Sequence, residues 1–177
     1  TVRSPPVGFF IPVGMKNPTG GDLTVLMNSI GAAQLPHTFI YRNWEVESKG
    51  NSLTHAVLRG YKDLNGAMRP NYGPDELTKI AGLYAQRGLK NPAIIIDTNH
   101  CNSGKDALKQ PEITRKVLES ANKSTEIKKL LKGFMVESYI EDGCQGSEGS
   151  VYGQSITDPC LGWEKTERLI FDLAEKW

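Results

Sequence analysis

Hydrophobic and polar positions define two kinds of segment that alternate along the chain. Short runs rich in Val, Ile and Phe, bounded by Gly, Pro and Asn, are typical of buried strands. They occupy residues 9–16, 37–41, 55–60, 93–97 and 133–138. Most are separated by segments whose apolar residues recur at helical spacing. Because apolar strands that alternate with helices are typical of a parallel sheet covered by helices, the pattern predicts an α/β fold.

Capping residues mark the expected helices. Asp22 is the expected N-cap of a first helix that continues through Gln34. Pro74 begins a second helix and Gly88 ends it. Further helices are indicated around residues 113–118, at 127–131 and at 163–177. The pattern leaves open whether residues 127–131 continue the preceding helix or form a separate short one.

Residues 37–60 depart from this alternation. No helical pattern separates the runs 37–41 and 55–60, and the polar RNWEVESKGNSLT between them contains Gly50-Asn51. We therefore expect a hairpin excursion from the sheet, followed by a strand. The rest of the chain is consistent with a single domain over residues 1–177. Because the chain begins at Thr1 without a methionine, residues 1–10 are treated as an uncertain start.

Composition narrows the class of protein. The 177 residues are 38% hydrophobic and 23% charged, which suits one compact domain with a core. A formal net charge of +1 indicates neither a nucleic-acid partner nor an anionic membrane surface. No apolar run approaches the roughly 18 residues of a membrane span. The three cysteines lack zinc-type spacing and are odd in number, which favours a reducing compartment, and we expect a cytoplasmic protein.

Charged and metal-ligating residues stand where the apolar runs end. Lys16, Arg59, Asp97, His100 and Glu137 hold such positions on four runs. In α/β proteins the reactive groups cluster at the carboxyl ends of the strands. A strand-end Lys or Glu is by itself more often a solvated loop residue, but the coincidence favours a site. Histidine and carboxylates suit a divalent transition metal, and the two cations suit a phosphate or carboxylate.

The motifs that carry these residues have a specific resemblance to a known family. IPVGMKNPTGGDL, AVLRG, IIIDTNHCNSGK, FMVESYIEDG and SITDPCLGWEKTERLI, in this order, resemble the type I 3-deoxy-D-arabino-heptulosonate 7-phosphate (DAHP) synthases. The resemblance implies a (β/α)8 TIM barrel, of which the chain matches only strands five to eight and the hairpin beside strand six. A complete barrel typically needs about 250 residues. A half-barrel leaves a strand edge and an apolar face uncovered, so we expect a homo-oligomer or a complementing N-terminal half.

The resemblance also implies an activity and roles for individual residues. The family condenses phosphoenolpyruvate with erythrose 4-phosphate, with the help of a divalent metal, in the first step of the shikimate pathway. His100, Glu137 and Asp158 match metal ligands, for Mn, Fe, Co or Zn. Lys16 and Arg59 match residues that hold phosphoenolpyruvate, and Asp158 also contacts the aldose phosphate. Lys16, His100 and Asp158 are the implied catalytic residues. The family's remaining metal ligand is a cysteine on the first barrel strand, a region that this chain does not match.

Three further residues lie in or next to the segment that carries His100, and we expect two of them to support it. We expect Asp97 to orient His100 or a nearby cation by hydrogen bonding, as a metal-bound imidazole usually requires. Cys101 follows His100 directly, and adjacent residues near a strand end point in opposite directions, so we do not expect it to be a ligand. We expect Asn102 to shape the loop by bonding local backbone.

Two other functions fit parts of the pattern. The chain could be a catalytically silent half-barrel fragment, or a regulatory module that binds phosphate or metal without turnover. Lys16 at a strand end also fits an aldolase that forms a Schiff base with its substrate, but the motif match assigns this lysine to an anion.

Overall fold

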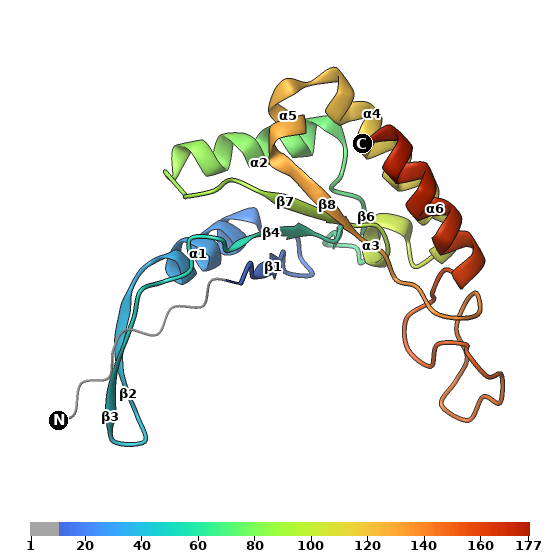
Figure 1. Cartoon of the computed structure of the whole chain (residues 1–177), viewed down its shortest axis with the longest axis horizontal. Coiled ribbons are helices and arrows are strands. Elements are labelled where there is room, and N and C mark those ends of the chain that lie inside the picture. The colour runs from blue at the N-terminus through green and yellow to red at the C-terminus, as the bar shows by residue number, and fades with distance from the viewer. Residues whose placement is uncertain (1–10) are drawn as a thin grey trace.

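The computed structural model describes residues 11–177 and has the shape of an arch (Figure 1). A parallel sheet in the order β1-β4-β7-β8 lies near the top of the arch. Its strands are β1 (Gly14–Lys16), β4 (His55–Leu58), β7 (Ile94–Asp97) and β8 (Leu131–Met135). The predicted α/β fold with a parallel sheet is confirmed.

Helices connect the strands and cover the sheet. They are α1 (Leu23–Gln34), α2 (Pro74–Gln86), the short α3 (His100–Ser103), η1 (Ala107–Lys109), α4 (Gln110–Lys123), α5 (Thr125–Leu130) and α6 (Trp163–Lys176). As predicted, Asp22 caps α1: its carboxylate accepts the N–H groups of Thr24 and Val25. Ser124 is extended and its hydroxyl caps α5, which makes α4 and α5 separate helices.

The core lies between the sheet and these helices. Alternate strand residues Ala56 and Leu58 on β4, and Ile94 and Ile96 on β7, are fully buried. They belong to one cluster with the apolar stripes of the helices: Leu26, Met27, Ile30, Leu77, Ile80, Tyr84, Ile113, Val117, Leu118, Ile127 and Leu130. The helical spacing read from the sequence therefore identified the inward faces of α1, α2, α4 and α5. In α6 it was only partly right, because Leu169 is buried whereas Trp163, Ile170 and Trp177, expected on the same face, are exposed. None of the helices in residues 11–177 combines the length and apolar character that crossing a bilayer requires.

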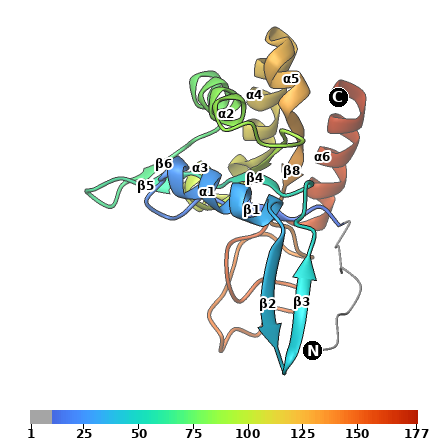
Figure 2. The same ribbon diagram turned by 90° about the vertical axis from the view of Figure 1, so that its left-hand side faces the viewer.

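The hairpin is formed by β2 (His37–Tyr41) and β3 (Trp44–Ser48), and it projects away from α2, α4 and α5 (Figure 2). Tyr41 pairs with Trp44, so the turn is Arg42-Asn43, both with positive φ, as a type I′ turn requires. The prediction centred on Gly50-Asn51 misplaced this turn. Gly50 also has positive φ, but a Cβ there would lie 2.3 Å from the carbonyl oxygen of Gln34. Gly50 thus permits a close backbone approach to α1.

The boundaries of the other strands differ slightly from those predicted. The first run was expected over residues 9–16, of which residues 9–10 lie outside the described part of the chain, as does the uncertain start 1–10. The last run was expected over residues 133–138, whereas β8 begins at Leu131 and ends at Met135. A second short hairpin, β5 (Tyr61–Lys62) with β6 (Met68–Arg69), follows β4.

Candidate functional site

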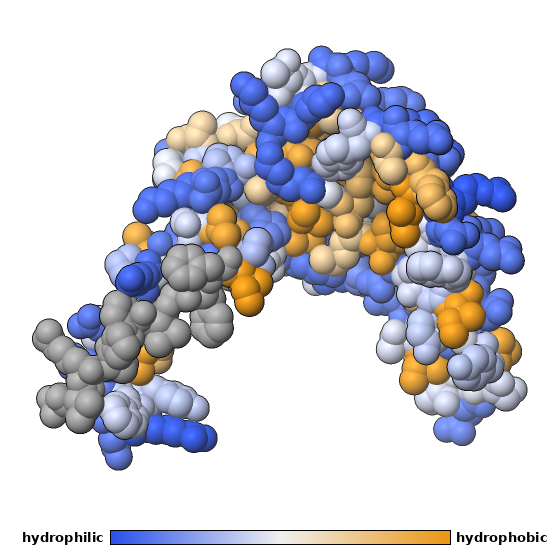
Figure 3. Space-filling model, in the orientation of Figure 1, coloured by the Kyte–Doolittle hydropathy of each residue, from blue (hydrophilic) through white to orange (hydrophobic). Residues whose placement is uncertain are grey.

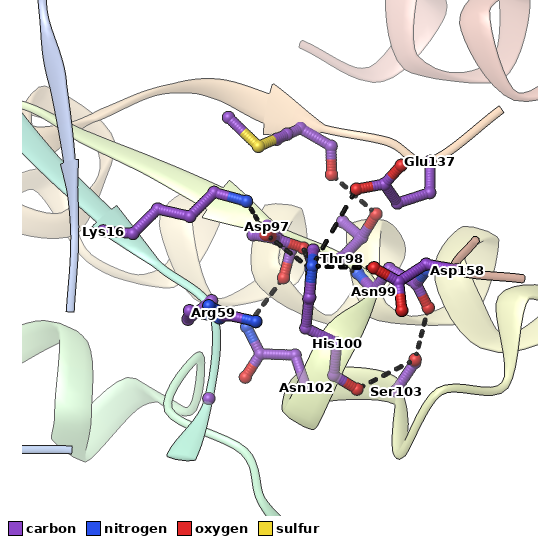
Figure 4. Close-up of polar contacts among 12 residues, drawn as sticks. Lys16, Arg59, Asp97, Thr98, Asn99, His100, Asn102, Ser103, Glu137 and Asp158 are labelled. Atoms are coloured by element: carbon purple, nitrogen blue, oxygen red, sulfur yellow. Dashed lines mark hydrogen bonds and ion pairs between the residues drawn. The ribbon is translucent and has the colours of Figure 1, made fainter. Parts of the chain in front are cut away.

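The predicted site residues come from the carboxyl ends of all four parallel strands (Figure 4). Lys16 is the last residue of β1, and Arg59 follows β4 directly. Asp97 is the last residue of β7, and His100 begins α3 three residues later. Glu137 lies two residues beyond β8, and Asp158 comes from the long segment before α6.

Asp97 is the centre of this arrangement. Its side chain is fully buried, and its Oδ2 accepts a hydrogen bond from Nζ of Lys16 at 2.9 Å. Nδ1 of His100 lies 3.0 Å from Oδ1 and 2.9 Å from Oδ2 of the same carboxylate. A carboxylate accepts hydrogen bonds, so Nδ1 is the donor, which leaves Nε2 as the ring nitrogen that can act as a ligand. One buried anion therefore orients both the lysine and the histidine.

Nε2 of His100 faces two further carboxylates. It lies 3.5 Å from Oδ2 of Asp158 and 4.0 Å from Oε1 of Glu137. Two donors that share an ion with bonds of about 2.1 Å can be at most about 4.2 Å apart. The nitrogen and the two oxygens therefore suit a divalent metal in type, and each oxygen lies within this distance of Nε2. Within residues 11–177, however, no group of three or more His, Cys, Asp or Glu side chains is arranged to hold a metal as it stands.

Lys105 contributes a cation that the sequence analysis did not assign to the site. Its Nζ donates to Oδ1 of Asp158 at 3.1 Å, and its backbone N–H donates to the carbonyl of His100 at 2.8 Å. The hydrogen bond from Lys105 is the main cause that lowers the pKa of Asp158, and the positive charges of Lys105 and Arg59 act in the same direction. Asp158 is therefore an anion at neutral pH.

The backbone of Arg59 is fixed while its side chain remains available. Its N–H donates to the side-chain oxygen of Asn17 at 2.9 Å, and its carbonyl accepts the N–H of Cys101 at 3.1 Å. The guanidinium has no ion pair or hydrogen bond with another residue of the described part of the chain. The planar guanidinium is therefore available to bind a phosphate or carboxylate in a bidentate manner, through two parallel hydrogen bonds.

Buried amides join the strand ends to one another. The side chain of Asn102 donates to the carbonyls of Leu58 at 3.0 Å and of Asp97 at 2.7 Å, which links β4 to β7. The bond to Asp97 is the expected contact with local backbone, and the bond to Leu58 is an additional long-range contact. Asn17 links β1 to β4 through Arg59, and the sequence analysis gave it no role. In the sequence, the only indication of this role is that Asn17 directly follows Lys16, at the end of an expected strand.

The cysteines are free thiols, as none of the three forms a disulfide. Cys101 and Cys160 are buried and Cys144 is exposed. Burial raises the pKa of the Cys160 thiol, which therefore stays protonated at neutral pH.

Comparison with known proteins gives a consistent result across the chain. The family described as the DAHP synthetase I family matches residues 8–170. A Tyr-sensitive phospho-2-dehydro-3-deoxyheptonate aldolase from Enterobacter agglomerans is 35% identical over 99% of this chain and 82% of its own length. The Trp-sensitive enzyme of that name from Escherichia coli is 36% identical over 92% of this chain.

A solved structure agrees with these sequence matches. The phospho-2-dehydro-3-deoxyheptonate aldolase from Francisella tularensis SCHU S4 superimposes on 96% of this chain with a TM-score of 0.79 and 30% identity. This chain covers 49% of that protein and 46% of the E. coli relative. It therefore spans about half the length of these two proteins.

Proposed function

Because the chain belongs to the DAHP synthetase I family, we propose that it carries the second half of a (β/α)8 barrel and takes part in making DAHP. The reaction is the metal-dependent condensation of phosphoenolpyruvate with erythrose 4-phosphate, the first step of the shikimate pathway. The relatives named above carry the name of this activity.

The proposal rests on two side chains that donate hydrogen bonds to Asp97: the cationic Lys16 and His100, a residue type that commonly binds metals. This buried carboxylate holds Lys16 on one side and Nδ1 of His100 on the other. An anionic substrate bound to Lys16 would therefore lie next to a metal ion bound to Nε2 of His100. A condensation between two substrates requires such fixed, adjacent positions, because orientation is a large part of the rate enhancement.

His100, Glu137 and Asp158 would hold the divalent metal. A nitrogen and two carboxylate oxygens admit Mn, Fe, Co or Zn. When bound, the metal would act as a Lewis acid on the aldehyde oxygen of erythrose 4-phosphate. Nδ1 of His100 is already fixed by Asp97, which is the usual support of a metal-bound imidazole.

Lys16 and Arg59 would bind the phosphate and carboxylate of phosphoenolpyruvate and direct its C3 at the aldehyde carbon, while Asp158 would also contact the aldose. A C–C bond forms between these two carbons, and the aldehyde oxygen takes up a proton. Water then adds to C2, and cleavage of the bond to the phosphate group releases inorganic phosphate. Nζ of Lys16 is positioned to exchange a proton during these steps.

The sheet has an uncovered apolar face and free strand edges, which a partner could cover. Apolar surface gathers at the centre of the molecule, between the two legs of the arch (Figure 3). An open cavity of about 320 Å³ is lined mainly by apolar groups of Pro12, Leu53, His55, Asn91, Pro92, Ala93, Ile95 and Lys132. An uncovered apolar face and free strand edges favour association. We propose that a separate N-terminal half, or a second copy of the chain, completes the barrel.

A catalytically silent or regulatory half-barrel is the second candidate. It is favoured by one observation: within residues 11–177, no group of three or more His, Cys, Asp or Glu side chains is arranged to hold a metal as it stands. Such a module would keep the phosphate-binding cations without condensing the substrates.

Native mass and activity measured on one sample separate the two candidates. A native mass above the 19.5 kDa of one chain, with Mn²⁺-dependent release of phosphate from phosphoenolpyruvate only when erythrose 4-phosphate is present, supports the synthase. A stable monomer without metal binding or condensation supports the silent module. His100→Ala tests the site directly: if it binds Mn²⁺ as tightly as the unchanged chain, the proposed ligand set is wrong.

A further inference from the structure

Gln110, the first residue of α4, makes contacts that neither the motifs nor the proposed chemistry explain. Its side chain is fully buried although it carries a primary amide. The amide nitrogen donates to the carbonyl of Glu137 at 2.9 Å, and the amide oxygen accepts the N–H of Glu137, also at 2.9 Å. One side chain thus holds both polar groups of a single backbone residue, as a neighbouring strand would.

The place of this contact is where the sheet ends. The last pair between β7 and β8 joins Asp97 to Met135, so Glu137 lies beyond the sheet ladder. Gln110 replaces the missing strand partner on that side, and Leu161 donates its N–H to the carbonyl of Glu137 from another segment at 2.9 Å. The backbone of Glu137 is therefore fixed without being part of a regular strand.

The amide of Gln110 is itself held in one orientation. The hydroxyl of Thr98 donates to its oxygen at 2.8 Å, and Thr98 also donates its N–H to the carbonyl of Met135 at 3.0 Å. Thr98 lies between Asp97 and His100, the pair that fixes the imidazole. The same turn after β7 thus orients His100 directly and Glu137 through Gln110.

We propose that Gln110 is a positioning residue that holds the backbone of Glu137 so that its carboxylate faces Nε2 of His100. This inference depends on the proposed function, because it assigns the contact a purpose in metal binding. Only a primary amide of this length supplies a donor and an acceptor together. Residues that support metal ligands typically change metal affinity about 10–100-fold when they are replaced.

The chain contains a matched control for this contact. Gln34, the last residue of α1, is a buried glutamine that makes the same pair of hydrogen bonds to the backbone of Lys90. Its amide nitrogen donates to the carbonyl of Lys90 at 2.9 Å, and its oxygen accepts the N–H of Lys90, also at 2.9 Å.

Each glutamine also makes a third hydrogen bond, Gln110 with Thr98 and Gln34 with the carbonyl of Thr54. Replacing either glutamine by methionine keeps the length of the side chain and removes all three of its hydrogen bonds. Of these two contacts, only that of Gln110 holds the backbone of a proposed metal ligand, Glu137.

The experiment measures the dissociation constant for Mn²⁺ by electron paramagnetic resonance, together with the thermal midpoint of unfolding. The variants are Gln110→Met, Gln34→Met and His100→Ala, all in the full chain. We expect both methionine variants to lower the thermal midpoint, and only Gln110→Met to weaken Mn²⁺ binding, by about tenfold or more. Equal Mn²⁺ affinity in Gln110→Met and Gln34→Met would overturn the inference.

The remaining outcomes separate this inference from the proposed function. If His100→Ala loses Mn²⁺ and Gln110→Met does not, the metal site stands and the role of Gln110 fails. If His100→Ala keeps the affinity of the unchanged chain, or the unchanged chain binds no Mn²⁺, the metal site itself fails and takes this inference with it. If Gln110→Met does not fold, Thr98→Val decides, because it keeps the shape of the side chain and removes the hydroxyl, which lies 2.8 Å from the amide oxygen of Gln110 and 3.0 Å from the carbonyl of Met135. Unchanged Mn²⁺ affinity in Thr98→Val would then overturn the inference.

Discussion

Replacing Asp97 by asparagine tests the shared carboxylate that joins Lys16 to His100. The substitution keeps the shape of the side chain and removes its charge. The carboxylate accepts from Nζ of Lys16 at 2.9 Å and from Nδ1 of His100 at 2.9–3.0 Å. An asparagine has one oxygen and a donating NH₂ group. If the NH₂ takes the place of Oδ2 it faces Nζ of Lys16, and if it takes the place of Oδ1 it faces the backbone N–H of Asn99, which donates to Oδ1 at 3.0 Å. Whichever way the amide turns, a donor faces a donor.

The expected loss follows from the burial of the two partners. Removing one member of a buried ion pair typically costs about 3–5 kcal/mol. The carboxylate is fully buried, but the Lys16 side chain is 35% exposed, and water recovers part of the loss for the lysine. We therefore expect the free energy of unfolding to fall by about 2–3 kcal/mol. In a chain of this size that lowers the thermal midpoint by about 4–12 °C.

The assay is thermal unfolding followed by circular dichroism, with Glu112→Gln as the control. Glu112 pairs with Lys116 one turn along α4, where both side chains are more than half exposed. That substitution removes the same charge, but from an exposed pair, so its shift should be much smaller. If Asp97→Asn lowers the midpoint no more than Glu112→Gln does, the buried carboxylate does not stabilise the site and the argument from its geometry is refuted.

Three further substitutions test separate parts of the structure. Asp22→Ala should cost about 1 kcal/mol of stability in urea unfolding, because it removes the N-cap of α1; a loss near zero would contradict the cap. Gly60→Ala should cost more than about 2 kcal/mol, because φ is 71° and the new Cβ would lie 2.6 Å from the backbone nitrogen of Asn102; an unchanged midpoint would show that this backbone can shift freely. Asp142→Asn should lower the thermal midpoint at pH 7 but not in acid. The ion pair with Lys165 lowers the folded pKa of Asp142 below 3.8, so its contribution is present above that pH and disappears as the pH falls through the folded pKa. A difference that does not shrink as the pH falls below 3.8 would contradict this assignment.

The elements of the fold were predictable wherever a local pattern determines the structure. Apolar runs and capping residues located β4, β7 and α1, because burial on one face leaves a periodic trace in the sequence. The break between α4 and α5 stayed open, because it depends on the extended backbone of Ser124 and not on periodicity. The hairpin turn was misplaced because Gly50 meets a tertiary need, a close approach to α1, which has the same sequence signature as a turn.

The charged residues at the strand ends were predictable from the sequence, whereas Lys105 and the buried amides that join the strand ends were not. Lys16, Asp97 and Glu137 stand at or just beyond strand ends, a position that a sequence shows. Gln110 and Asn102 act through contacts with segments up to 44 positions away, and a buried amide leaves no periodic signal. Their roles follow only from the three-dimensional arrangement of the strand ends.

The parallel sheet has a consequence for the order in which the chain folds. Gly14 pairs with His55, 41 positions later; Ala56 with Ile94, 38 later; and Ile94 with Leu131, 37 later. Each pairing closes a long loop, whereas Tyr41 and Trp44 of the hairpin are only three positions apart. Local hairpins form within about 1–10 μs, and long-range pairings are slower because loop closure costs entropy before contacts repay it. Each strand delivers one part of the candidate site, so the site is assembled only in the last stage of folding.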